Sequence, residues 1–334
     1  MARWHPVRRV QSPGQPSPSG GTVEHMFAMS DKDVREQAAV LAMTEASPGP
    51  WYEVADVVEE AGSAVAIIEG QHTFYEEPQA LIAQRLAERT TEEMIERWGE
   101  TIDKALAGTP DTRLITVLDE DYPSNLRRIY DRPPFLFVRG TLSEDDSRSV
   151  AIVGTRRASD AGRALARDMA AALTERGVTV ISGMAAGIDT EAHTAALDTG
   201  GRTIAVMGTG IDRVYPKQNQ ALSERIAASG ALLSQFWPGA PPRGTNFPLR
   251  NVVTSGVAIG TVVIEASSTS GAKMQARLAL EHGKQLFLVE SLVLHEEWAQ
   301  RYKTRRGAQV VGGVDDVVAA LEAEREPVTE LQLF

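Results

Sequence analysis

Cysteine is absent from the 334 residues of this chain. Its absence excludes disulfides, thiolate nucleophiles and cysteine-based metal sites, and it allows a reducing compartment, so we expect a cytoplasmic protein. Long apolar runs are lacking too, because no stretch approaches the roughly 18 residues that a membrane span requires. We therefore predict no membrane contact, and no motif indicates a metal or a cofactor.

An excess of positive charge is also missing, since the formal net charge is −11. This value argues against a protein whose whole surface attracts nucleic acid. The charge is uneven, however. Residues 23–110 hold 18 acidic and six basic side chains, whereas residues 145–290 hold 13 acidic and 15 basic ones. An anion site is therefore expected in the second segment.

Composition divides the chain into four regions. Residues 1–29 are rich in Pro, Ser and Gly without an apolar core, which predicts a disordered leader and not a secretory signal. Residues 30–108 are predicted to form a small helical domain, residues 109–322 an α/β domain, and residues 323–334 a tail.

The helical domain is indicated by apolar side chains that recur every four residues, at Met94, Trp98, Ile102 and Leu106. This spacing places them on one helix face, and we expect that face to pack against a core.

From residue 114 onward, short strand-like runs alternate with helical stretches. The predicted strands are 114–118, 135–138, 150–153, 178–181, 203–207, 231–233, 261–264, 285–289 and 309–311. The predicted helices are 161–176, 190–197, 219–228, 272–283 and 315–321. This alternation predicts a doubly wound, mostly parallel sheet of the Rossmann type, whose ligands bind at the carboxyl ends of the strands.

The first loop of this kind contains Gly154, Thr155 and Arg156, between a buried strand and a helix that begins near Ser159. Free backbone N–H groups and the helix dipole favour an anion there, and a guanidinium adds a charge suited to phosphate. The loop lacks the Gly-x-Gly-x-x-Gly pattern of dinucleotide sites. A phosphate site and a tight structural turn both remain open.

The second loop contains Ser182, Gly183 and Gly187, followed by Asp189 at the start of a helix. We predict that Asp189 caps this helix and that His193, one turn later, meets it. Such a pair is compatible with general-base chemistry or with a structural hydrogen bond, and no nucleophile is evident.

The third loop holds Tyr215 and Lys217 on either side of Pro216, a rigid turn that presents the lysine near a helix start. Lys217 is a candidate phosphate ligand and Tyr215 a candidate base-stacking ring. A solvated lysine is the other interpretation.

The fourth group comprises Arg250 and Asn251, expected to lead a helix, and Ser270 and Gly271 in a Ser/Thr/Gly loop. Glu265 precedes that loop and is expected to hydrogen-bond backbone or hydroxyl groups. A phosphodiester backbone along the sheet edge would use Arg156, Lys217 and Arg250 together, whereas one small nucleotide would rarely need all three.

The sequence also resembles the DprA/Smf (DNA-processing protein A) family over about residues 110–320. The similar segments are Tyr122–Leu126, Pro133–Gly140, Val153–Arg156, Ser182–His193, Gly201–Val206, Tyr215–Pro216, Phe247–Asn251 and Val263–Gly271.

The resemblance implies an extended Rossmann fold, a helical N-terminal domain of the SAM or helix-hairpin-helix type, and a homodimer. It also implies a non-enzymatic protein that binds and protects single-stranded DNA and loads the RecA recombinase in natural transformation or recombination. In the family, the positions of Arg156 and Lys217 contact DNA.

Three departures from the family pattern stand out. Val252 replaces the second arginine of Arg-Asn-Arg, Gln235 replaces glutamate after Ser234, and Glu290-Ser291 replaces Pro-Gly. Two alternative functions stay open: a phosphoribohydrolase-like enzyme that uses Glu265, and a nucleotide-sensing module.

Overall fold

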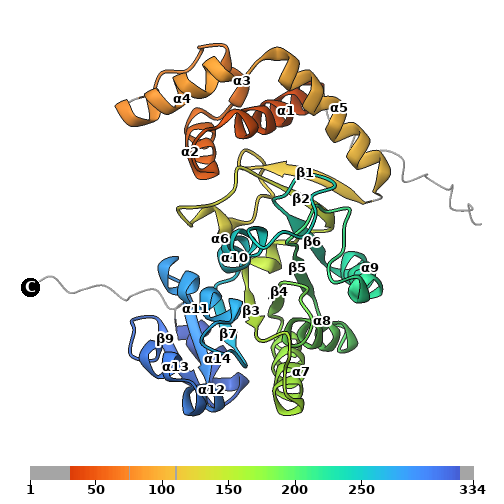
Figure 1. The fold of residues 1–334 in the computed structure, drawn as a ribbon, viewed down its shortest axis with the longest axis vertical. Helices are drawn as coiled ribbons and strands as arrows, with labels where there is room; N and C mark the ends of the chain where they lie inside the picture. Colours follow the sequence, from red (N-terminus) through yellow and green to blue (C-terminus); the bar gives the residue numbers. More distant parts are fainter. Residues whose placement is uncertain (1–30, 75, 110, 324–334) are drawn as a thin grey trace, which may run out of the picture.

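The computed structural model describes residues 31–74, 76–109 and 111–323 (Figure 1). The predicted leader, and the predicted tail beyond residue 323, lie outside the described residues. The N-terminal helices are α1 (Asp31–Ala46), α2 (Trp51–Ala61), α3 (Ala64–Ile68), α4 (Glu77–Arg89) and α5 (Glu92–Gly108). Within the described ranges, no helix combines the length and apolarity needed to cross a bilayer.

The described residues form a nine-stranded sheet in the order β1-β2-β6-β5-β4-β3-β7-β8-β9. The strands are β1 (Thr112–Thr116), β2 (Phe135–Gly140), β3 (Ser149–Val153), β4 (Thr179–Ser182), β5 (Thr203–Val206), β6 (Ala231–Ser234), β7 (Gly260–Val263), β8 (Gln285–Val289) and β9 (Ala308–Val311). Only the β1–β2 and β2–β6 pairings are antiparallel. The prediction of a doubly wound, mostly parallel sheet is confirmed.

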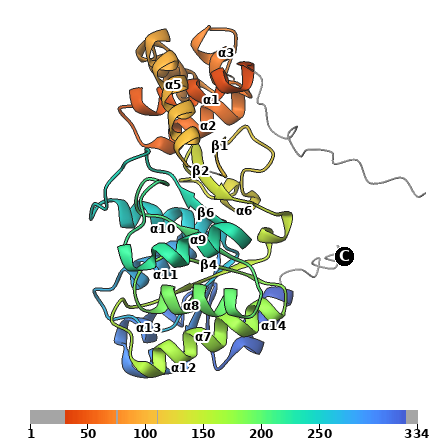
Figure 2. The same ribbon diagram turned by 90° about the vertical axis from the view of Figure 1, so that its right-hand side faces the viewer.

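Helices cover both faces of the sheet. They are α6 (Ser124–Arg127), α7 (Asp160–Glu175), α8 (Ile188–Asp198), α9 (Gln220–Ser229), α10 (Asn246–Val257), α11 (Gly271–Glu281), α12 (Glu290–His295), α13 (Glu297–Tyr302) and α14 (Val314–Ala323), with short 3-10 turns η1 (Glu144–Ser147) and η2 (Lys217–Asn219). One face carries α10 and α11, and the other carries α7, α8 and α9, the layer that faces the viewer in Figure 2. Strands buried on both faces explain the near-continuous apolar runs.

The chain reverses its direction of travel at β3. After β3 it adds β4, β5 and β6 on one side, and it then returns to place β7 on the other side of β3. The loops after β3 and β7 therefore diverge and leave a crevice at the carboxyl ends of these strands, the position where open α/β sheets bind their ligands.

The helical part packs on the antiparallel edge of the sheet, above β1 and β2 in Figure 1. Buried side chains of α1, α2 and α5 belong to the same apolar core as those of β1 and β2. On α5, Trp98 and Ile102 are buried and the other two members of the predicted stripe, Met94 and Leu106, pack against the same core. That prediction is confirmed.

Two local predictions differ from the structure. The helix expected to begin at Arg250 begins at Asn246, so that Arg250 lies inside it. Residues 290–302, which carry no clear pattern, form the two short helices α12 and α13.

Candidate nucleic-acid interface

Two adjoining cavities lie at the carboxyl edge of the parallel strands. The larger, of about 310 Å³, occupies the crevice between β3 and β7. The smaller, of about 110 Å³, continues towards the loop after β5. Both are lined by Arg156, Gly183, Ala185, Phe247 and Arg250. They therefore form one groove, called here the edge groove, which follows the strand ends from β7 to β5.

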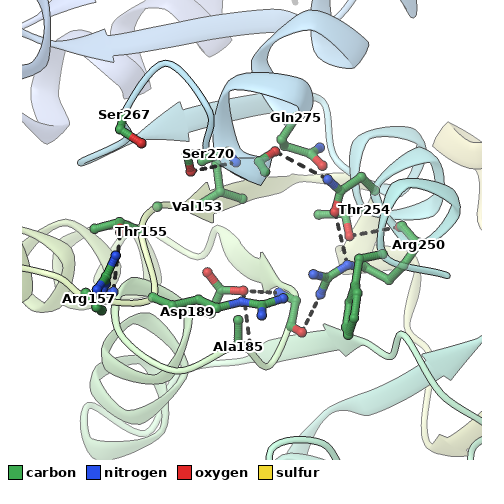
Figure 3. Close-up of a pocket in the computed structure, with 17 residues that line it drawn as sticks. Val153, Thr155, Arg157, Ala185, Asp189, Arg250, Thr254, Ser267, Ser270 and Gln275 are labelled. Carbon is green, nitrogen blue, oxygen red and sulfur yellow. Dashed lines mark hydrogen bonds between the residues drawn. The ribbon is translucent and has the colours of Figure 1, made fainter. Parts of the chain in front are cut away.

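Figure 3 shows the labelled side chains around the larger cavity, with Thr155 and Arg157 on one side and Arg250 and Thr254 on the other. Of the predicted residues, Gly154, Thr155, Arg156, Gly183, Asp189, Arg250, Asn251, Ser270 and Gly271 line this cavity. The loops after β3, β4 and β7 are thus brought together as expected for one ligand site.

Arg156 is exposed and lies over the ring of Phe247, with 5.0 Å between its guanidinium carbon and the ring centroid. This cation–π contact orients the arginine without neutralising it. Tyr215, at 5.9 Å from the same ring, extends the aromatic surface into the smaller cavity. Phe247 was not among the predicted site residues, because its role depends on a contact with a distant loop.

Arg250 is buried, with 7% of its surface exposed. Its Nη1 donates to the carbonyl of Gly183 and to that of Val206 at 3.1 Å, and its Nε donates to Asn251 Oδ1 at 3.1 Å. Burial lowers the pKa of Arg250, although the nearby Asp189 opposes this effect. The guanidinium therefore forms part of the groove floor and charges it from below.

Gly183 makes this arrangement possible. A Cβ at this position would overlap with Arg250 Nη1. Only glycine leaves room for the guanidinium against the loop after β4.

The expected pairing of Asp189 with His193 is wrong. Asp189 Oδ2 accepts from the backbone N–H groups of Gly183 and Ala185, at 3.1 and 3.2 Å, so it closes the preceding loop instead of capping α8. Burial raises the pKa of this carboxyl, with Arg250 and the two N–H groups opposing. His193 Nδ1 instead lies 2.7 Å from Thr203 Oγ1.

Three predicted ligands, Gly187, Ser182 and Lys217, lie outside the groove lining, and Gly187 is the residue that precedes α8. Ser182 is fully buried and donates to the carbonyl of Ile152 at 2.6 Å, which makes it structural. Lys217 is exposed at the start of η2, directly after Pro216 of the smaller cavity. Asn219, which sequence reasoning missed, fixes η2 by donating 2.9 Å hydrogen bonds to Met184 O and Thr190 Oγ1.

Glu265 serves the framework, as expected of a carboxylate after a strand. Its Oε2 accepts from Ser159 N at 3.0 Å and from Ser159 Oγ at 2.9 Å, while Ser159 Oγ caps α7 by accepting from Gly162 N. Ser270 caps α11 in the same way, accepting from Ala272 N at 3.1 Å. Glu265 does not line the edge groove.

The edge groove carries a net positive charge at its surface. No carboxylate of the described residues lies within 4.0 Å of Arg156, Arg157 or Lys217. By contrast, Arg163 and Arg167 on α7 both pair with Glu191. Among the described lining residues, Asp189 is the only carboxylate, and it is buried beneath the surface.

Comparison with known proteins agrees with this geometry. Residues 113–322 match the family described as DNA recombination-mediator protein A. The chain is 39% identical over 216 residues to Protein Smf of Synechocystis, covering 63% of this chain and 54% of that protein. It is 38% identical over 208 residues to DNA processing protein DprA of Streptococcus pneumoniae, covering 62% and 73%. It thus spans about half the length of the Synechocystis relative.

Solved structures show the same fold. The X-ray structure of the S. pneumoniae DprA superposes with a TM-score of 0.66 at 29% identity, over 85% of this chain and 97% of that one. DprA from Helicobacter pylori, solved for its single-stranded DNA binding mode, superposes with a TM-score of 0.57 at 25% identity, over 64% and 96%. The match from β1 to α14 and the shared fold confirm the resemblance, and the chain belongs to the DNA recombination-mediator protein A family.

Proposed function

We propose that this protein binds single-stranded DNA along the edge groove without covalent chemistry. The observation that carries the proposal is a set of cations without carboxylate partners among the described residues: Arg156 and Arg157 line the groove above the buried Arg250, and Lys217 follows the lining residue Pro216. Phosphate contacts supply most of the affinity in such complexes, and aromatic rings add base stacking. The H. pylori relative, which binds single-stranded DNA, supports the same ligand.

A strand fits the groove better than a mononucleotide does. The cationic and aromatic side chains come from the loops after β3 and β5 and from α10, which are more positions than one phosphate group would be expected to contact. Arg156 lies over the ring of Phe247, and Tyr215 lies 5.9 Å from the same ring, so that cationic and aromatic side chains adjoin, as expected where phosphates and stacked bases are both bound.

We further propose that the protein acts as a homodimer that protects the strand and loads RecA onto it in transformation or recombination. The names of the relatives, a recombination mediator and a DNA processing protein, support this role. RecA assembly on oligonucleotide coated with single-strand-binding protein should accelerate when the protein is added. Sedimentation should give twice the monomer mass.

Binding of fluorescent oligo-dT at two salt concentrations tests the proposed ligand. Affinity should fall steeply with salt, and Arg156→Ala and Lys217→Ala should each weaken binding and reduce the log–log salt slope by about 0.7 per lost phosphate contact. Lys104→Ala is the matched control, because Lys104 lies on α5 and pairs with Glu100. Salt-independent binding, or full affinity of the Arg156/Lys217 double variant, would refute the proposal.

The enzymatic alternative has weaker support. A phosphoribohydrolase-like mechanism would need Glu265 beside the phosphate-binding loops, but this carboxylate accepts hydrogen bonds from Ser159 and lies outside the edge groove. Release of free base from a nucleoside monophosphate, abolished in Glu265→Gln, would favour the enzyme. Tight mononucleotide binding without oligo-dT binding would favour a nucleotide sensor.

A further inference from the structure

A larger cavity adjoins the edge groove on the side of β7 and β8. It measures about 640 Å³ and shares Thr155 and Ser267 with the 310 Å³ cavity of the edge groove. Its walls are the first turns of α7, the segment after β7, and α12. Its lining includes Ala161, Leu165, Ile264, Glu265, Leu292 and His295.

One wall of this cavity contains residues that depart from the family pattern. Glu290 and Ser291 stand where the family resemblance expects Pro-Gly, and here they begin α12. The following helix α13 anchors this wall, because Trp298 is 1% exposed and its Nε1 donates to the carbonyl of Ala266 at 3.0 Å. Ala266 lies between Glu265 and Ser267. The wall is therefore tied directly to the loop that separates the two cavities.

The lining chemistry differs from that of the edge groove. No arginine or lysine of the described residues lines this cavity, whereas Leu165, Ile264 and Leu292 provide apolar surface. A phosphate group would lose hydration there without gaining a cationic partner. A flat group with apolar faces and a hydrogen-bond donor at its edge suits the cavity, whose lining also includes the carboxylate of Glu296 and the exposed imidazole of His295.

Glu265 supplies a directional acceptor to this cavity. Its Oε2 is occupied by the two hydrogen bonds from Ser159, while Oε1 lies 3.4 Å from Ser159 N at the edge of hydrogen-bond range. A carboxylate accepts from the amino group of cytosine, whereas thymine has a carbonyl oxygen at that position and presents only its N3–H, between two carbonyl oxygens that repel a carboxylate. The geometry therefore favours a base with an exocyclic amino group over thymine.

We infer that this cavity takes one nucleobase of a bound strand whose phosphates follow the edge groove, and that it prefers an amino-bearing base such as cytosine. The inference rests on the proposed function and adds base preference to it. Continuity of the two cavities through Thr155 and Ser267 allows a base and its neighbouring phosphate to occupy them together.

Competition between oligo-dC and oligo-dT of equal length tests the inference. The wild-type protein should bind oligo-dC about fivefold more tightly, the lower end of what one good base contact supplies. Ala161→Trp fills the cavity from an exposed position of α7 and should reduce this ratio to about one. Ala228→Trp, at an exposed position near the end of α9, is the matched control and should keep the ratio.

Glu265→Gln gives a second, independent readout. An amide side chain can donate to the thymine carbonyl, so the preference for oligo-dC should fall while total binding persists. Because Glu265 also holds Ser159, the thermal midpoint is measured alongside, and the ratio is compared at a temperature where all variants are folded.

The outcomes separate the two proposals. Failure of the wild-type protein to bind either oligomer would overturn the proposed function itself. Salt-sensitive, Arg156-dependent binding with no preference for oligo-dC, or with a preference that Ala161→Trp leaves unchanged, would overturn only the base cavity. Equal weakening of both oligomers by Ala161→Trp would also overturn it, since that result indicates a blocked strand path without base selection.

Discussion

The contact between Arg250 and Gly183 gives the floor of the edge groove its charge. The guanidinium remains beneath the surface because carbonyl oxygens at two strand ends accept hydrogen bonds from it. Burying a charge is tolerated only with such partners, so any side chain that displaces the guanidinium also disturbs the groove.

Gly183→Ala should therefore lower both stability and DNA affinity. Its Cβ would press on Arg250 Nη1, and overpacking of this kind costs about 1–3 kcal/mol of unfolding free energy. Urea denaturation and oligo-dT titration measure the two effects. Gly244→Ala is the control, because a Cβ there has open space. Equal behaviour of the two variants would contradict the proposed function of Gly183.

His193 should make stability depend on pH. Burial, and next the charge of Arg250, lower its pKa to about 3. Thr203 Oγ1 donates to Val180 O and so accepts from Nδ1, which leaves Nε2 bare and without a partner among the described residues. The unfolded chain takes up this proton near pH 6.5, so the free energy of unfolding should fall by about 1.4 kcal/mol per unit as pH drops below about 6.

His193→Gln should remove this slope. Urea denaturation at several values between pH 7.5 and 5 compares the variant with wild type, and carboxylates common to both proteins cancel in the difference. His295→Gln, at an exposed position, should keep the wild-type slope. A slope that persists in His193→Gln would show that His193 does not stay neutral in the folded protein.

Individual site residues were predictable where they follow a strand, and unpredictable where a distant contact decides their role. Arg156 was identified because a buried run ends before it. The burial of Arg250 was not predicted, because its acceptors are Gly183, directly after β4, and Val206, at the end of β5, and the sequence gives no distance to them. Phe247 was missed for the same reason, since its partner Arg156 is on another loop.

The bounds of helices and strands were predictable from the sequence where the spacing of apolar residues is regular. The nine strands of the described residues were all predicted within about two residues of their bounds, because strands buried on both faces must be apolar. The order of the strands was not predicted, since pairing depends on the long crossovers. The helices α12 and α13 were missed because at six residues each they are too short to show a period.

The N-terminus of α7 should be sensitive to loss of its cap. Ser159→Ala removes the acceptor for Gly162 N and one donor to Glu265, and cap removal costs about 1 kcal/mol of unfolding free energy. Ser229→Ala, at the exposed last residue of α9, should cost less than half as much. Chemical denaturation of both variants checks this, and equal losses would contradict the capping role.

The helical layer and the edge groove are mechanically connected through one loop of the sheet. Trp237, in the loop after β6, stacks on Phe135 at 4.9 Å and contacts Trp98 and Trp51 of the helical layer at 4.5 and 5.4 Å. The same loop is bonded to the loop after β5 through Gly210 N and Ala240 O, at 3.0 Å.

The connection continues to the groove through Asn246. This side chain donates to Gly208 O at 3.1 Å and to Pro241 O at 3.2 Å, and the next residue along the chain is Phe247. Movement of the Trp237 loop would therefore shift the aromatic ring that holds Arg156.

Trp237→Ala should consequently weaken oligo-dT binding in addition to costing about 3 kcal/mol of stability, the lower end for loss of a large core aromatic. Trp51→Ala is the matched control, because it removes another ring of the same cluster and leaves the Trp237 loop bonded to the loop after β5 and to Asn246 of α10. Both affinities are measured by titration at a temperature where the variants are folded. Only the Trp237 variant should lose affinity, since only that ring belongs to the loop that precedes Phe247. Equal affinities would mean that the edge groove keeps its shape without support from the helical layer.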